Sequence, residues 1–188
     1  LIDTVKAEFF SEMRGRIASV IDPSRIDYIV SNHAEMDHSG SLPRAIEEFS
    51  PEQVFCSVMG EKALRAHFGA ALELTAVKTG DSVKIGRNEL HFLETRMLHW
   101  PDSMTSYLTA EKILFSQDAF GMHLAGSERF AAAYEDALLY EEAKKYFANI
   151  LLLQAPKVAE LLEALPGVLP EVAMIAPDHG PIWCGDQH

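Results

Sequence analysis

The sequence predicts an α/β protein, a layered α/β/β/α sandwich with mixed sheets. Strand-like and helix-like segments alternate over residues 1–68, short strands parted by turn residues occupy residues 76–116, and a helical pattern with one more strand fills the rest. Alternating strands and helices are typical of a sheet that is covered by helices. Short strands separated by turns indicate antiparallel hairpins, so both kinds of strand pairing are expected.

The N-terminal elements follow from the spacing of the apolar residues. Leu1–Val5 is expected as a short strand, and Lys6–Val20 has the apolar period of a helix, which Asp22-Pro23 ends. Ile26–Val30 is β-branched and aromatic, which indicates a strand. A helix, a strand and a second helix are then expected at Pro43–Phe49, Gln53–Ser57 and Gly60–Phe68.

The middle of the chain is expected to form hairpins, with strands at Ala76–Lys78, Ser82–Ile85, Glu89–Glu94, Ser106–Thr109 and Lys112–Ser116. From Tyr134 the apolar residues follow a helical period up to Pro156, which ends or kinks the helix. Val158–Leu165 continues as a second helical piece, and Glu171–Ile175 is the last expected strand.

Length and composition indicate one globular domain over residues 1–188, with 48% hydrophobic and 23% charged residues. The net charge of −12 repels phosphate backbones and anionic membranes, so no nucleic-acid partner is expected. No apolar run has the length that a bilayer requires, and no secretory signal is recognised, so no membrane partner is expected. Cys56 and Cys184 have no metal-binding spacing, which favours reduced, packed thiols and a cytoplasmic protein.

Residues that can bind metals gather after the strand Ile26–Val30. Four potential ligands lie within six residues: His33, Glu35, Asp37 and His38. In an extended segment residues i and i+2 point to one side, so the first two can share one metal. The other two lie past a turn and can reach a second metal. A carboxylate-rich set without thiolates suits iron, manganese or zinc.

Three further candidate ligands each follow a predicted strand: His99, Asp118 and His179. In layered folds, strand ends on one rim of a sheet are where active sites gather. Asp118 has two carboxylate oxygens and can therefore bridge two cations. The alternative for these residues is an ordinary acidic, histidine-bearing surface.

This pattern resembles the metallo-β-lactamase superfamily, in which a His-x-His-x-Asp-His motif precedes a His, a bridging Asp and a final His. Glu35 stands where the hydrolases usually have His. That departure resembles the flavodiiron proteins, flavin-linked oxygen and nitric oxide reductases, over essentially the whole chain. The likeness is carried by the segments Asn32-His33-Ala34-Glu35-Met36-Asp37-His38-Ser39-Gly40-Ser41-Leu42-Pro43, Asp118-Ala119-Phe120-Gly121 and Pro177-Asp178-His179-Gly180-Pro181-Ile182-Trp183. Met36 replaces the expected Pro, which alters loop stiffness and removes no ligand.

The resemblance implies two iron ions with a bridging oxo or hydroxo group. It assigns one iron to His33, Glu35 and His99, the other to Asp37, His38 and His179, and the bridging position to Asp118. Three carboxylates and one hydroxide would balance the charge of two ferrous ions, which suits redox chemistry. A hydrolytic dizinc site needs more positive charge to acidify its water.

The resemblance also implies the reduction of O₂ to water, of NO to N₂O, or of both. O₂ takes up four electrons and two irons store two, so an outside donor is required. In the family this donor is FMN on a C-terminal flavodoxin-like domain. A rubredoxin-type protein passes electrons to the FMN. The family usually forms head-to-tail homodimers. This chain shows no phosphate-binding loop for FMN, starts one or more strands late and ends soon after His179, so we expect a piece of a longer protein.

Two other functions are open at this point, a dizinc or iron–zinc hydrolase of the metallo-β-lactamase type and a non-catalytic diiron sensor of O₂ or NO. Near the ligands, His123 and Asp178 are candidates for lining the pocket or for orienting a ligand. Trp100 and Phe120 are candidate apolar walls, and their alternative role is packing.

Overall fold

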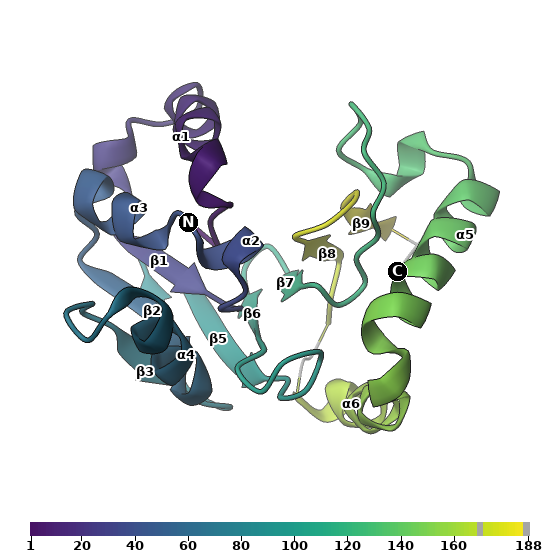
Figure 1. The fold of residues 1–188 in the computed structure, drawn as a ribbon. Coiled ribbons are helices and arrows are strands. Elements are labelled where there is room, and N and C mark those ends of the chain that lie inside the picture. The colour runs from purple at the N-terminus through teal and green to yellow at the C-terminus, as the bar shows by residue number, and fades with distance from the viewer. Residues whose placement is uncertain (169–170, 186–188) are drawn as a thin grey trace. The chain divides into compact units, whose positions relative to one another are not determined.

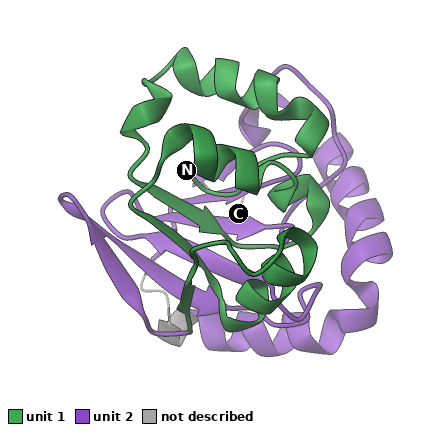
Figure 2. Cartoon of the chain, turned by 60° about the vertical axis from the view of Figure 1, so that its left-hand side comes forward, with its two compact units in different colours: residues 1–78 green, residues 79–188 purple. Residues whose placement is uncertain are grey.

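The computed structural model describes residues 1–168 and 171–185 (Figure 1). Within these ranges the chain forms two compact units, residues 1–78 and residues 79–188, which Figure 2 colours green and purple. The first unit holds a three-stranded sheet and the second a six-stranded sheet. In the described part of the chain, every helix is too short or too polar to traverse a lipid bilayer.

The first unit contains a parallel sheet in the order β1 (Tyr28–Ser31), β2 (Gln53–Ser57) and β3 (Thr75–Val77). Its helical elements are η1 (Ala7–Phe9), α1 (Phe10–Ala18), η2 (Pro23–Arg25), α2 (Met36–Ser39), α3 (Leu42–Phe49) and α4 (Val58–Phe68). The predicted alternation of strands and helices in this region is confirmed, with boundaries displaced by one to four residues in most elements.

The core of the first unit lies on one face of this sheet. The register pairs Ile29 with Val54, and Cys56 follows two residues later on the same side. Residues of three helices pack on this face in one buried cluster, namely Phe10 of α1, Leu42, Ala45 and Phe49 of α3, and Leu64 of α4. Cys56 is fully buried in this cluster, as its predicted packing role requires. The burial of these side chains holds the helices on the sheet.

The second unit contains a mixed sheet in the order β4 (Ser82–Ile85), β5 (Asn88–Glu94), β6 (Met104–Leu108), β7 (Ile113–Gln117), β8 (Met174–Pro177) and β9 (Trp183–Cys184). Strands β7 and β8 are parallel, and the other neighbours are antiparallel. The helical elements are η3 (Ala131–Ala133), α5 (Asp136–Tyr146), the π-helical η4 (Phe147–Leu151), η5 (Leu152–Gln154) and α6 (Ala155–Val168).

The core of the second unit has two clusters that share Trp183. One cluster joins Tyr107, Leu114 and Ile175 of neighbouring strands. The other joins the segment after β7 to α5 through Met122, Ala131, Leu139 and Tyr146. Trp183 packs against both clusters, so strand β9 links the sheet to helix α5.

Two predictions at the chain's first and last strands are wrong in detail. Leu1–Val5 does not form a strand, because only a single bridge, Ile2 to Val30, joins this segment to β1. The last long strand, expected at Glu171–Ile175, is β8 at Met174–Pro177, and the two-residue strand β9 was not predicted. A two-residue strand is too short to show a period of two in the sequence.

The helical segment around Pro156 also differs from the prediction. The regular α5 ends at Tyr146, well before the proline, in a π-helical turn and a 3₁₀ turn. Pro156 lies in the first turn of α6, where the missing N–H of proline costs no helical hydrogen bond. The proline therefore starts the second helix and does not break the first.

Candidate metal centre

The ligand loop of the first unit follows directly on strand β1. His33 is fully buried and His38 is nearly so, while the side chains of Glu35 and Asp37 keep exposures of 37% and 29%. Asp37 and His38, which were expected past a turn after Glu35, lie on the short helix α2. In a helix, neighbouring side chains point about 100° apart around the axis, whereas in an extended chain they point to opposite sides.

The donor atoms of this loop lie close enough together to share a cation. The Nε2 atom of His33 lies 3.3 Å from Oε2 of Glu35. The Nε2 atom of His38 lies 3.6 Å from Oδ1 of Asp37, and the two histidine rings are 5.1 Å apart. A metal–ligand bond of about 2.1 Å puts two ligands of one ion about 3.0–3.4 Å apart. The pair of His33 and Glu35 therefore fits a metal without rearrangement.

The segment before helix α1 holds this loop in place. The buried carboxylate of Asp3 accepts hydrogen bonds from the backbone N–H groups of Asn32, at 2.9 Å, and His33, at 3.4 Å. The backbone N–H and the hydroxyl of Thr4 both donate to the carbonyl of His38 at 2.7 Å. The two histidines are thus fixed through their own backbones by residues about thirty positions earlier in the chain.

In the second unit, Asp118 lies directly after strand β7 and is 2% exposed. Its Oδ2 atom is 3.0 Å from Nε2 of His99, and its Oδ1 atom is 3.2 Å from Nε2 of His179. Each carboxylate oxygen therefore faces one histidine. This is the disposition of a carboxylate that bridges two cations, each of which also has an imidazole ligand.

Gln117 ties together the segments that carry the three ligands of the second unit. This residue is fully buried, and its side-chain amide donates to the carbonyl of Leu98, next to His99. The side-chain oxygen accepts from the backbone N–H of Asp118 at 2.8 Å. Its backbone carbonyl accepts from the N–H of Asp178 at 3.0 Å, one residue before the third ligand. One residue thus sets the spacing of three loops.

The carboxylate of Asp118 also has a phenol partner, because the hydroxyl of Tyr146 donates to its Oδ1 at 3.0 Å and is buried with it. Gly121 allows the close approach of these segments. A Cβ atom at this position would lie 2.8 Å from the carbonyl oxygen of Asp118 and 3.2 Å from that of His179. A larger residue would therefore force the two ligand loops apart.

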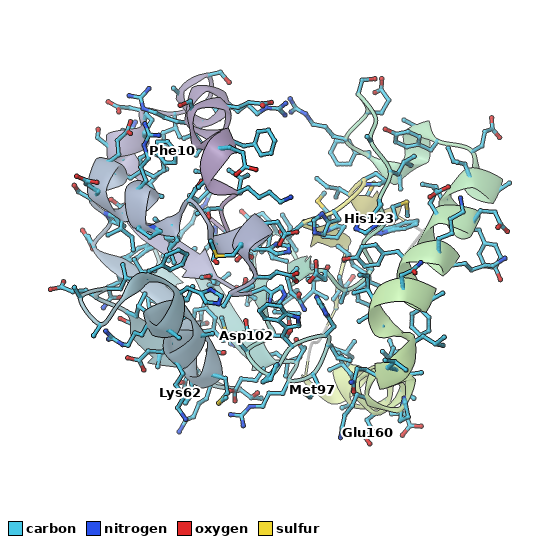
Figure 3. All side chains as sticks on the ribbon, viewed as in Figure 1. Phe10, Lys62, Met97, Asp102, His123 and Glu160 are labelled. Atoms are coloured by element: carbon cyan, nitrogen blue, oxygen red, sulfur yellow. The ribbon has the colours of Figure 1, made fainter. Side chains whose placement is uncertain are left out.

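The predicted neighbours of the ligands lie in the same part of the second unit. His123 (Figure 3) has its ring 5.6 Å from that of His179 and 4.8 Å from that of Tyr146. Trp100 meets the ring of His99 edge to face at 6.0 Å. Phe120 is partly exposed and lies two residues after Asp118. The backbone N–H of Asp178 donates a hydrogen bond to the backbone carbonyl of Gln117. Their roles stay predictions.

Three positioning residues were not identified from the sequence: Asp3, Gln117 and Tyr146. A signal exists for Gln117, because the polar pair Ser116-Gln117 follows the apolar run Ile113–Phe115 immediately before a candidate ligand. Asp3 and Tyr146 reach their partners across 29 and 28 positions of the chain, and no local pattern marks such contacts.

Comparisons with known proteins agree with this arrangement. The model of the ODP family beta lactamase matches residues 1–180. The rubredoxin-oxygen oxidoreductase of Megalodesulfovibrio gigas is 46% identical over 188 residues, which cover 98% of this chain and 46% of that protein. The nitric oxide reductase of Moorella thermoacetica is 39% identical over 187 residues, which cover 99% of this chain and 47% of that protein.

A solved structure gives the same result for the fold. The flavodiiron protein from Giardia intestinalis superposes with a TM-score of 0.93 at 36% identity, over 99% of this chain and 45% of that one. The chain thus spans about half the length of the relatives that it matches. The predicted metallo-β-lactamase-like fold is confirmed, and the chain belongs to the ODP family of metallo-β-lactamase-like flavodiiron proteins.

Proposed function

We propose that this chain is the diiron part of a reductase that converts O₂ to water, NO to N₂O, or both. The relatives with which it shares 46% and 39% identity carry the names of an oxygen oxidoreductase and a nitric oxide reductase. In this proposal seven residues hold two iron ions: His33, Glu35, Asp37, His38, His99, Asp118 and His179. Oxygen and nitrogen donors of this kind suit iron.

The observation that carries the proposal is the placement of Asp118. Its two oxygens face two different histidines at 3.0 and 3.2 Å. A carboxylate that bound only one metal would place only one of its oxygens beside a histidine ligand of that metal. Glu35, 3.3 Å from His33, adds a third carboxylate where a histidine is expected in the hydrolases. The extra negative charge favours an electron-transferring site over one that acidifies water.

Two ferrous ions bound by these residues would supply two electrons for the reduction of a small oxidant. The side chains described above would hold the ions and shield them from water. The hydroxyl of Tyr146 donates a hydrogen bond to Oδ1 of Asp118, which limits the orientations of the carboxylate. His33 and His38 are buried, so their imidazoles meet a metal with little competing water. Asp3 and Gln117 fix the backbones of the ligand loops.

The proposal includes an outside source of electrons. FMN on a flavodoxin-like domain, reduced by a rubredoxin-type protein, is the donor that we infer, since one relative is named for rubredoxin. A head-to-tail homodimer would bring the flavin of one subunit to the irons of the other. A cytoplasmic location is part of the proposal, because reduced thiols such as those proposed for Cys56 and Cys184 persist in a reducing compartment.

Anaerobic purification, metal analysis and gas-consumption assays test this function. We expect two irons per chain, and consumption of O₂ or NO with reduced flavin and rubredoxin. Asp118→Ala should lower the iron content, while His91→Ala, a change of a partly exposed strand histidine beside Glu89, should keep two irons per chain. Zinc with hydrolytic turnover and no gas consumption would refute the proposal, and so would reversible O₂ binding without turnover when a competent donor is present.

A further inference from the structure

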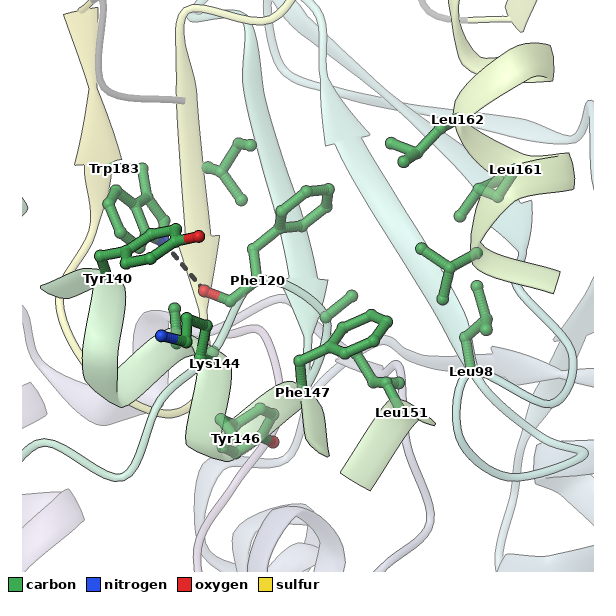
Figure 4. A pocket seen from close by; sticks show the side chains of 15 residues that line it. Leu98, Phe120, Tyr140, Lys144, Tyr146, Phe147, Leu151, Leu161, Leu162 and Trp183 are labelled. Carbon is green, nitrogen blue, oxygen red and sulfur yellow. Dashed lines mark hydrogen bonds between the residues drawn. The ribbon is translucent and has the colours of Figure 1, made fainter. Parts of the chain in front are cut away.

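A large apolar cavity lies in the second unit, between helices α5 and α6 on one side and strands β8 and β9 on the other (Figure 4). Its volume is about 500 Å³, and all of its lining residues belong to this unit. Most of the wall is carbon, from side chains such as Phe147, Leu151, Val158, Leu161, Ile175 and Trp183. The cavity is therefore suited to an apolar guest and poorly suited to a charged one.

Two polar side chains of the described wall, those of Trp183 and Lys144, have partners within the protein. The indole N–H of Trp183 donates to the carbonyl of Phe120 at 2.8 Å. The amine of Lys144 lies 4.8 Å from the centre of the exposed Tyr140 ring and binds Glu141 at 2.8 Å on the surface. These groups have partners already, so they offer little to a guest that needs hydrogen bonds.

The inner end of the cavity reaches the bridging carboxylate. The segment Ala119–Gly121, which follows Asp118, forms part of the wall, and so does the ring of Tyr146. The hydroxyl of Tyr146 donates to Oδ1 of Asp118 at 3.0 Å. A single phenol ring therefore separates the apolar space from a candidate metal ligand.

The helix beside the cavity has a local widening. Residues Phe147–Leu151 form a π-helical turn directly after Tyr146, and both ends of that turn line the cavity. Such turns are rare in proteins and occur often at functional sites.

We propose that this cavity binds small apolar gas molecules and holds them beside Asp118. An enclosed cavity lined by Leu, Ile and Phe side chains binds xenon, because its walls offer water no partners. The cavity of this chain has the same kind of wall, although it is partly open to solvent, where Tyr140 and Leu162 are exposed. O₂ and NO share this chemistry with xenon, since they are small and bind water weakly. One water-sized molecule needs roughly 30 Å³, so the cavity has room for several diatomic molecules. That O₂ or NO is the natural guest rests on the proposed function.

Xenon binding to the metal-free 188-residue chain tests the cavity without any catalysis. We expect saturable xenon-dependent shifts in the methyl NMR signals of Leu151 and Leu161. Two variants that fill the space, Ala143→Phe on α5 and Val158→Phe on α6, should lower xenon affinity roughly tenfold, about 1.4 kcal/mol. The exposed neighbours on the same helices give matched controls, Ala137→Phe and Ala159→Phe, which should bind xenon like the original chain.

The variants also connect the cavity to gas consumption. In the iron-loaded protein, both filling variants should slow consumption severalfold at low gas concentration, with iron content and the iron absorption spectrum unchanged. Absence of saturable xenon binding, or equal binding in a folded filling variant, would overturn the cavity proposal. Xenon binding with unaltered gas rates in the filling variants would overturn its role for the substrate. If the unsubstituted protein consumes neither gas, the proposed function fails while the xenon result stands. If one filling variant does not fold, xenon binding and gas consumption are compared in the other filling variant.

Discussion

The side-chain amide of Gln117 donates a hydrogen bond to the backbone carbonyl of Leu98, across 19 positions of the chain. This bond joins the loop of one candidate ligand, His99, to the end of strand β7, which another candidate ligand, Asp118, follows directly. The same side chain accepts from the N–H of Asp118, so both ends of one planar amide are used. Because an amide has a fixed shape, it sets the distance between the two segments that it joins.

Gln117→Leu tests this link. Replacing the amide by an apolar side chain leaves two buried backbone groups without their partner, at a cost of roughly 1–3 kcal/mol for each. We expect a lower free energy of unfolding in urea and an altered visible spectrum of the cobalt-substituted protein. The change Gln53→Leu, at an exposed position of strand β2, should leave both unchanged. An unaltered cobalt spectrum in a folded Gln117→Leu protein would show that the amide does not position the ligands.

Asp3→Ala tests the anchor of the first unit. The carboxylate of Asp3 accepts hydrogen bonds from the backbone N–H groups of Asn32 and His33. A hydrogen bond to a charged group contributes about 1.5–3 kcal/mol to stability. We expect lower stability and weaker iron binding, with partial recovery in Asp3→Asn, which keeps one acceptor oxygen. The exposed Asp27→Ala is the control. Equal iron affinities in Asp3→Ala and Asp27→Ala would contradict the anchoring role.

Gly121→Ala and Gly15→Ala should have opposite effects. At Gly121 the new Cβ would lie 2.8 Å from the carbonyl oxygen of Asp118, so two ligand loops must shift. At Gly15, in the middle of helix α1, nothing lies within 4 Å of such an atom. Alanine is favoured over glycine in a helix by up to about 1 kcal/mol. Thermal unfolding should show a lower Tm for the first variant and an equal or higher Tm for the second; the reverse order would refute the steric argument.

The variant Tyr146→Phe removes the phenol hydroxyl and keeps the ring, so it tests the role of the hydroxyl alone. The ring packs in the cluster with Leu139 and lines the cavity, and the hydroxyl donates to Asp118. Loss of one such bond costs about 0.5–1.5 kcal/mol, so the protein should still fold. We expect a changed reduction potential of the iron-loaded protein and unchanged xenon binding. The exposed Tyr140→Phe is the control, and an identical potential in both variants would exclude a role for the Tyr146 hydroxyl.

The sequence by itself determined the order of the strands and helices and the candidate ligands. Periods of two and 3.6 in apolar residues report local backbone geometry, so β4 was predicted at its observed bounds and α3 nearly so. The cluster from His33 to His38 stands out because polar residues follow a buried strand. Short elements such as α2 and β9 were missed, since they contain too few residues to show a period.

Only the tertiary structure decided how the ligands are held. The bonds from Asp3 to Asn32, from Gln117 to Leu98 and from Tyr146 to Asp118 connect residues far apart in the chain. Each partner is an ordinary residue by itself, and its role arises from the fold that brings the two together. Local patterns can therefore identify the atoms that would bind a metal, whereas their orientation and the adjoining cavity depend on packing across the whole of each unit.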